Sequence, residues 1–173
     1  MNEDTFGNLD EWGHVLERLH ELKRSRDLDE HQEALARLLR YRDNWRLREK
    51  VLEYTHDIEN PTEELLAELV HIMTGDDVYL EARALAAKAL GHLIPRRKTS
   101  SEEKREFDKT RLVSHMINIL ESERPPYLRA AVAKSLAAMG DNRVLPVLQE
   151  MSQSPNSSPF LKKCVDEAIL EMS

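Results

Sequence analysis

The clearest helical segment of the chain is YLRAAVAKSL, residues 127–136. A close copy is EARALAAKAL, residues 81–90, and in both segments an arginine stands five residues before a lysine and seven before a leucine. Two weaker copies occupy residues 47–55 and 161–169. A segment that recurs along one chain is typical of a repeat architecture, in which each copy belongs to one supersecondary unit.

The spacing of apolar and small residues within the copies predicts an α-helix. Counted from Leu128, these residues fall at i, i+3, i+4, i+7, i+8 and i+11. This spacing places them in one stripe along a helix. The same pattern runs from Ala82 to Leu93 and from Leu161 to Met172, whereas Lys50 interrupts it in the earliest copy.

Each copy follows another helical stretch, so the chain divides into helix pairs. We expect Asn60 to be the N-cap and Pro61 the first residue of one such stretch. No segment alternates apolar and polar residues as a half-buried strand would. Because a helix with one apolar stripe must bury it against neighbours, we predict an all-α fold, an α-α superhelix (solenoid) of about four helix pairs plus an N-terminal helix at Leu9–Arg24. The predicted pairs are 30–42 with 44–59, 61–75 with 78–94, 109–122 with 126–140, and 142–153 with 158–172.

The register residues predict one domain, 1–173, with one insertion. Arg48 precedes Arg83 by 35 residues and Arg129 precedes Lys162 by 33, but the interval between Arg83 and Arg129 is 46 residues. The surplus falls at 95–108, which we interpret as an extended inter-repeat loop. Insertions in solenoids often lie on the binding face. Residues 1–29 are expected to form an N-terminal cap helix.

Composition and charge argue against several classes of protein. The net charge is -7, so a general attraction to nucleic acid is not favoured. No apolar run reaches the ~20 residues that a membrane-spanning helix needs, and no membrane association is expected. The single cysteine, Cys164, excludes an internal disulfide. The acidic start at 1–10 lacks the order of a signal peptide, so a cytoplasmic location is expected.

The repeated segments resemble HEAT-like repeats, an armadillo-type helical repeat family, in the short form found in bacterial proteins and phycobilin lyase-type chains. The resemblance covers about 30–173 and rests on a turn followed by apolar-Arg and a helix rich in small residues, as at 75–91 and 128–141. It implies that second helices line a concave surface. It also implies that the register arginines bond turn carboxylates between neighbouring repeats. The residues concerned are Arg48, Arg83 and Arg129, with Asp43, Asp76 or Asp77, and Glu123.

A partner surface is predicted on the second helices. Lys88 and Lys134 occupy equivalent positions off the apolar stripe, and His92 lies near the end of its helix. With the alanines between them they would suit a peptide or acidic helix, and plain solvated lysines are the alternative. The basic run Arg96, Arg97 and Lys98 would suit an acidic partner, or is a solvated loop.

Catalytic and metal-binding motifs are not recognised, and we expect the chain not to be an enzyme and to need no cofactor or metal. HExxH, GxSxG and phosphate-binding glycine loops do not occur. The repeated His-Glu pairs that the resemblance implies for iron-binding HEAT-like hydroxylases do not occur either. Cys164 lies on an apolar stripe and is expected to be a buried structural thiol. Trp12 and Trp45 are compared with the aromatic residues of HEAT-like DNA glycosylases, but core roles are favoured for both.

Together these features predict a non-catalytic scaffold or adaptor that binds a protein or peptide through its concave surface. The alternative is a HEAT-like enzyme or lyase-type accessory that acts on a nucleic acid or tetrapyrrole, and a pocket holding Trp45 beside an unpaired carboxylate would favour it. A third reading is self-association through an exposed apolar face of the helix 158–172.

Overall fold

The computed structural model describes residues 4–96, 108–122 and 125–173. Over these residues the chain forms nine α-helices, short 3-10 turns and no strand. The helices are α1 Trp12–Ser25, α2 Gln32–Arg40, α3 Trp45–Tyr54, α4 Glu63–Thr74, α5 Leu80–Leu93, α6 Lys109–Glu121, α7 Pro126–Ala138, α8 Leu145–Gln153 and α9 Pro159–Glu171.

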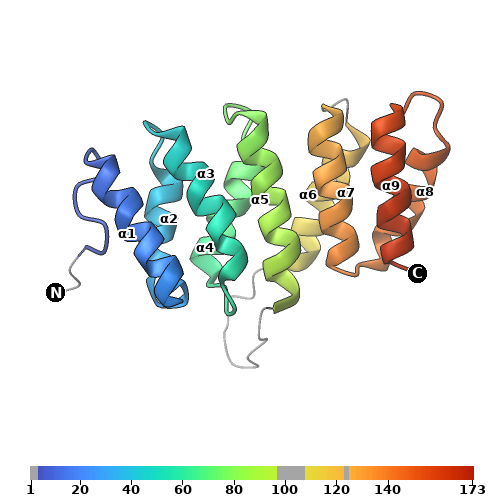
Figure 1. The fold of residues 1–173 in the computed structure, drawn as a ribbon. Helices are drawn as coiled ribbons and strands as arrows, with labels where there is room; N and C mark the ends of the chain where they lie inside the picture. Colours follow the sequence, from blue (N-terminus) through green and yellow to red (C-terminus); the bar gives the residue numbers. More distant parts are fainter. Residues whose placement is uncertain (1–3, 97–107, 123–124) are drawn as a thin grey trace.

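The helices form two layers. Figure 1 shows α1, α3, α5, α7 and α9 side by side in one row, which we call the odd-numbered layer, with α2, α4, α6 and α8 behind it. Within the row α5 packs against both α3 and α7, and α7 packs against α9, while α4 packs behind α5 and α8 behind α9. The two termini lie at opposite ends of the row. The prediction of an all-helical solenoid of four pairs plus an N-terminal helix is confirmed.

The apolar stripes predicted from the periodicity form the core. Leu128, Val132 and Leu136 of α7 are fully buried, as is Leu90 of α5. Cys164 of α9 is buried as expected. Within the described chain, every helix is too short or too polar to span a bilayer.

The helices α5 and α7 approach each other very closely at Gly91. A Cβ atom added to this glycine would lie 2.8 Å from the Cα atom of Ser135 and 2.9 Å from its Cβ atom. Contacts this short do not occur between real carbon atoms, so the glycine is a packing requirement. Small residues therefore set the distance between the second and third pairs.

Among the described residues, each register arginine binds a helix end, whereas the resemblance implied bonds to turn carboxylates of neighbouring repeats. Arg83 Nε donates to the carbonyl oxygen of Met73 in the last turn of α4, at 2.9 Å. Arg129 Nε and Arg48 Nη2 make the corresponding bonds to Leu120 at 2.8 Å and Tyr41 at 3.2 Å. The last carbonyl groups of a helix have no partner within the helix, so each buried or half-buried guanidinium stabilises the turn inside its own pair.

The turn carboxylates that the resemblance assigned to the register arginines differ from one another in their contacts. Arg83 Nη1 lies 3.8 Å from Asp76 Oδ1, inside one pair. Asp77 forms an ion pair with Arg42 in the turn of the preceding pair, at 2.7 Å. Glu123 lies outside the described residues.

The start of α4 differs from its prediction. Its N-cap is Thr62, whose hydroxyl accepts a hydrogen bond from the Leu65 amide at 3.3 Å. Pro61 and Asn60 precede the helix, and the Asn60 carbonyl accepts a hydrogen bond from Gln32 Nε2 at 2.8 Å. The predicted cap at Asn60 is wrong because threonine at the next-but-one position supplies the same acceptor closer to the free amides.

The predicted loop at 95–108 is only partly described. Ile94–Arg96 form a 3-10 turn, and residues 97–107, which include Arg97 and Lys98, lie outside the described residues. Arg96 is anchored to the preceding pair, where its Nη1 donates to the carbonyl oxygens of His56 at 2.7 Å and Ile58 at 3.1 Å.

Candidate functional site

A groove of about 520 Å³ crosses α5, α7 and α9 on the odd-numbered layer, and we call it the α5–α9 groove. Small residues line much of it, because the repeated segments carry alanine where larger residues would fill the space. Its lining residues are Ala84, Leu85, Lys88, Gly91, His92, Tyr127, Ala130, Ala131, Lys134, Ser135, Ala138, Phe160, Cys164 and Glu171.

The groove brings together Lys88, His92 and Lys134, three of the residues predicted to contact a partner. Lys134 Nζ lies 2.9 Å from Glu167 Oε2 on α9. This hydrogen bond raises the pKa of Lys134 and lowers the pKa of Glu167. Lys88 is exposed and makes no ion pair with any described residue. Lys88 therefore offers the groove a charge that no other described side chain neutralises, while the charge of Lys134 is shared with Glu167.

Histidines meet at one end of the groove. The rings of His56 and His92 have centroids 3.9 Å apart and lie edge to face. Burial is the main cause of a lowered His92 pKa, and the nearby His56, Arg96 and Lys88 lower it further because each disfavours a second positive charge. The neutral form of His92 is thus favoured, which leaves one ring nitrogen able to accept a hydrogen bond.

Two aromatic side chains border the groove where α7 and α9 begin. Tyr127 of α7 and Phe160 of α9 are 51% exposed each, although both border the groove. Tyrosine and other aromatic residues are enriched where proteins bind proteins, because a rigid ring buries much surface at low entropic cost.

Trp12 and Trp45 do not belong to the core, which corrects the roles favoured from the sequence. Trp12 is 57% exposed and Trp45 is 52% exposed. Both line a pocket of about 640 Å³, which we call the α1–α3 pocket, together with Leu16, Asp43, Glu49 and five other residues from α3 and the turn before it. Periodicity did not place them correctly because each is the first residue of its helix, where a side chain projects past the packed stripe.

The aromatic environment of Trp45 is ordered. Its ring meets Tyr79 edge-on at a centroid distance of 6.2 Å, and the Tyr79 hydroxyl donates to the Trp45 carbonyl at 3.1 Å. Burial, together with the charge of Glu49, raises the pKa of Tyr79 to about 12, so this hydroxyl stays protonated and keeps donating. The Arg46 guanidinium lies 5.2 Å from the Trp45 ring.

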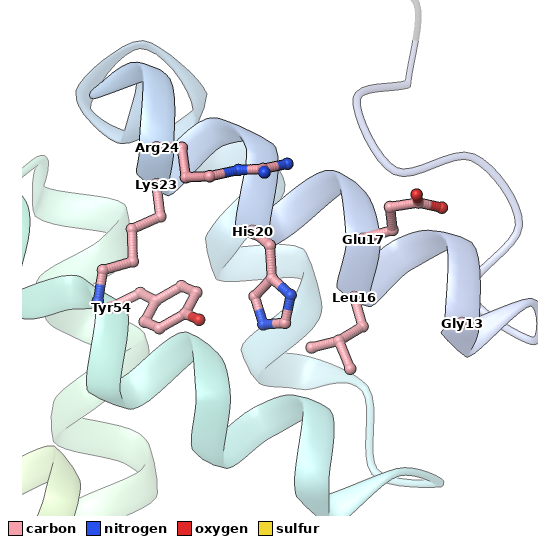
Figure 2. A pocket seen from close by; sticks show the side chains of 7 residues that line it. All are labelled: Gly13, Leu16, Glu17, His20, Lys23, Arg24 and Tyr54. Atoms are coloured by element: carbon pink, nitrogen blue, oxygen red, sulfur yellow. The ribbon is translucent and has the colours of Figure 1, made fainter.

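A third hollow, of about 660 Å³, lies between α1 and α3 further along the same helices. Figure 2 shows Leu16 and His20 pointing from α1 toward α3, while Glu17 and Arg24 point away. Lys23 Nζ lies 4.1 Å from the centre of the Tyr54 ring, and His20 lies 5.8 Å from it. Because Leu16 borders this hollow and the α1–α3 pocket, the two are neighbours on one surface.

The described residues offer no assembled metal site, since no three histidine, cysteine or carboxylate side chains among them group closely enough. One His-Glu dipeptide does occur, at His20–Glu21 in α1, but it is single. His20 contacts Tyr54, and Glu21 pairs with Arg18 at 3.1 Å.

One signal in the sequence points to the aromatic residues and was missed. Trp12, Trp45, Tyr79, Tyr127 and Phe160 each stand at the beginning of a helix of the odd-numbered layer. Counted along the chain they are 33, 34, 48 and 33 residues apart, which is the interval of the repeats with one longer connection. A residue type that recurs with the repeat but off the apolar stripe indicates a feature of the surface.

Comparison with known proteins identifies the architecture. The pattern of HEAT repeats matches residues 66–164, which is more than half of the chain. No curated protein matches the chain in sequence. Among solved structures, human deoxyhypusine hydroxylase in complex with glycerol is similar to it with a TM-score of 0.60 and 17% sequence identity. The similarity covers 86% of this chain but 45% of the hydroxylase chain, so the chain spans less than half of that enzyme.

This neighbour overturns the expectation that the chain is not an enzyme. That expectation rested on the lack of recognised catalytic motifs, whereas a protein with the same fold is a hydroxylase. At this level of identity the similarity carries the fold alone, and a fold hosts many unrelated functions. From its matched repeats and its helical solenoid, this chain belongs to the HEAT-repeat family.

Proposed function

We propose that this HEAT-repeat chain binds a protein or peptide partner in the α5–α9 groove. One observation carries the proposal, namely that Lys88, His92 and Lys134 gather around a groove lined with small residues and bordered by exposed Tyr127 and Phe160. A repeat solenoid is held together by neighbouring repeats, so its surface is rigid and can present such a groove without rearrangement.

The chemistry of the groove favours a helix or strand with apolar and acidic residues. Alanines leave room for the partner's backbone to approach, and the aromatic rings would cover its apolar side chains. The charge of Lys88 would meet a carboxylate. Glu167 and Glu171 limit the number of acidic residues that the groove accepts.

The test compares the wild type with Lys88→Glu/Lys134→Glu. Proteins retained from native lysate are identified, purified and titrated against each variant. We expect one partner to bind the wild type in fixed stoichiometry and the double variant at least tenfold more weakly. The matched control is Lys109→Glu/Arg111→Glu, which makes the same charge change on exposed residues of α6, outside the groove.

Equal binding by both double variants would contradict the proposal for this groove. Nucleic acid or a coloured ligand retained in place of a protein would contradict it for the whole chain.

A second candidate function is supported by the α1–α3 pocket. Trp45 lies there beside Asp43, a carboxylate without an ion-pair partner among the described residues. This arrangement is what an enzyme or lyase-type accessory acting on a nucleic acid or tetrapyrrole would need. The acidic residues that line the pocket oppose a polyanion, however, so we place this candidate second. An absorbance spectrum of the purified chain tests it, because bound nucleic acid or pigment absorbs where the protein does not.

A further inference from the structure

Exposed aromatic residues form a row on the odd-numbered layer. All five helices of the layer begin at the same edge (Figure 1), and each carries an aromatic residue at its N-cap or its first or second position. Four of these residues are at least half exposed, and Tyr79 joins the row through its contact with Trp45. Exposed apolar residues that gather on one surface, unlike singly scattered ones, mark interaction sites.

The row is most open at the α1–α3 pocket. Trp12 is 57% exposed and makes no ring or cation–π contact with any described residue. Trp45 already holds the Arg46 guanidinium against its ring. The chain itself thus shows that a cation finds a favourable place on these rings.

Charge at this end of the row is negative. The pocket contains Asp43, Glu49 and Glu53, against Arg46 and Lys50. Lys50 Nζ lies 2.6 Å from Glu53 Oε2, so these two charges cancel. Asp43 and Glu49 then face one remaining cation, Arg46, which lies over the Trp45 ring, so the pocket keeps a net negative charge.

A second, shallow hollow that Trp12 also lines is acidic too. Asp10, Glu11 and Glu17 line it, and His14 is its only basic lining residue. Trp12 therefore borders two acidic hollows, whereas Lys88 and Lys134 lie on the distant α5–α9 groove.

We propose that the α1–α3 pocket binds a basic, extended segment of a protein partner, with an arginine or lysine side chain seated between Trp12 and Trp45 and paired with Asp43. The aromatic face supplies a cation–π contact and the carboxylate supplies charge. An anion is disfavoured by the same lining. This site goes beyond the groove proposed above and does not require that groove to bind anything.

The spacing of the row argues for an extended segment. Packed helices lie about 8–10 Å apart, and an extended chain rises about 3.3 Å per residue, so every third residue would meet the next helix. A segment with basic residues at that interval can follow the row from α1 to α3 and onward past Tyr79.

The two tryptophans make the test direct, because the chain has only these two and both line the pocket. The probe is a nine-residue amidated peptide with arginine at every third position and threonine and alanine between. Its control carries glutamate in place of each arginine. Intrinsic fluorescence is followed during each titration, first in the wild type and then in Trp12→Ala and Asp43→Asn.

We expect the arginine peptide to change the fluorescence to saturation and the glutamate peptide to leave it unchanged. Asp43→Asn and Trp12→Ala should each weaken binding about tenfold, and added salt should weaken it in the wild type. Arg111→Glu, at an exposed position of α6 outside both sites, should leave the affinity for the arginine peptide unchanged. Thermal unfolding of each variant checks that the fold persists, as the exposure of both substituted side chains leads us to expect.

Three results would overturn the proposal. The first is equal response to the arginine and glutamate peptides. The second is unchanged affinity in both Asp43→Asn and Trp12→Ala. The third is binding of free arginine amide as tightly as the peptide, which would assign the pocket to a small molecule. Loss of the partner in the Lys88→Glu/Lys134→Glu experiment concerns the other groove and leaves this site unaffected.

Discussion

Gly91 is the residue at which one methyl group matters most. It lies within α5, where alanine would ordinarily favour the helix by about 1 kcal/mol. The contact with Ser135 reverses this preference, because the added Cβ atom would meet the backbone of α7, which cannot rotate away. We predict that Gly91→Ala lowers the free energy of unfolding by about 1–3 kcal/mol, measured by urea denaturation.

Gly13 provides the matched control for that prediction. It also lies in a helix, α1, but a Cβ atom there would meet nothing within 4 Å. Gly13→Ala should therefore stabilise the chain by about 0.5–1 kcal/mol through helix propensity. If both substitutions stabilised the protein, the close approach of α5 and α7 would not limit the packing.

His92 links stability to pH. Its folded-state pKa lies below the ordinary value of 6.5, chiefly through burial and secondarily through His56, Arg96 and Lys88. As the pH falls below about 6.5, the unfolded chain binds a proton more readily than the folded chain, so stability falls with it. We predict a lower thermal unfolding midpoint at pH 5.5 than at pH 7.5.

The contribution of His92 itself is isolated by substitution. His92→Gln should reduce the drop in the unfolding midpoint between these pH values, while His14→Gln at an exposed position of α1 should keep it. An identical pH dependence in wild type and His92→Gln would show that other groups cause the effect.

At the scale of the element, two residues near the beginning of α4 can be compared as its N-cap. Thr62 supplies the cap in the structure, whereas Asn60 is the cap expected from its place directly before Pro61. Thr62→Ala removes the acceptor of the Leu65 amide and should cost about 1 kcal/mol of unfolding free energy. Asn60→Ala should cost clearly less, because the bonds that Asn60 makes to Gln32 and Asp29 use its backbone. The reverse order in chemical denaturation would restore Asn60 as the cap.

At the scale of the whole molecule, a solenoid transmits a defect mainly to the adjacent repeat. Val165 of α9 is fully buried, and α9 packs on α7 and α8. Val165→Asp would bury an unpaired carboxylate, at a cost of several kcal/mol, so we expect α9 to detach. Hydrogen exchange should show lost protection in α8 and α9 and retained protection in α4 and α5.

Leu170 lies on the same helix but is 75% exposed, so Leu170→Asp is the control for helix propensity and charge. It should leave the exchange pattern unchanged. Uniform loss of protection in Val165→Asp would mean that the whole chain unfolds as one cooperative unit.

The helices themselves followed from the sequence alone. Apolar residues at a 3.6-residue period can be buried only as helical stripes, and recurrence of the stripe requires stacked pairs, whatever the detailed packing. This helical period determines the boundaries of the pairs and the burial of Cys164. It also determines that Lys88 and Lys134 occupy equivalent positions.

Only the tertiary structure decided how the helix ends and surfaces are used. Periodicity describes neighbours along one helix, so it placed Trp12 and Trp45 in the core, whereas packing leaves both rings exposed at one pocket. The HEAT-like resemblance implied that the register arginines bond turn carboxylates, whereas Arg83 and Arg129 donate to the free carbonyl groups of the preceding helix. These outcomes depend on distances between helices that are far apart in the chain, and such distances are set by how side chains from separate repeats fit together.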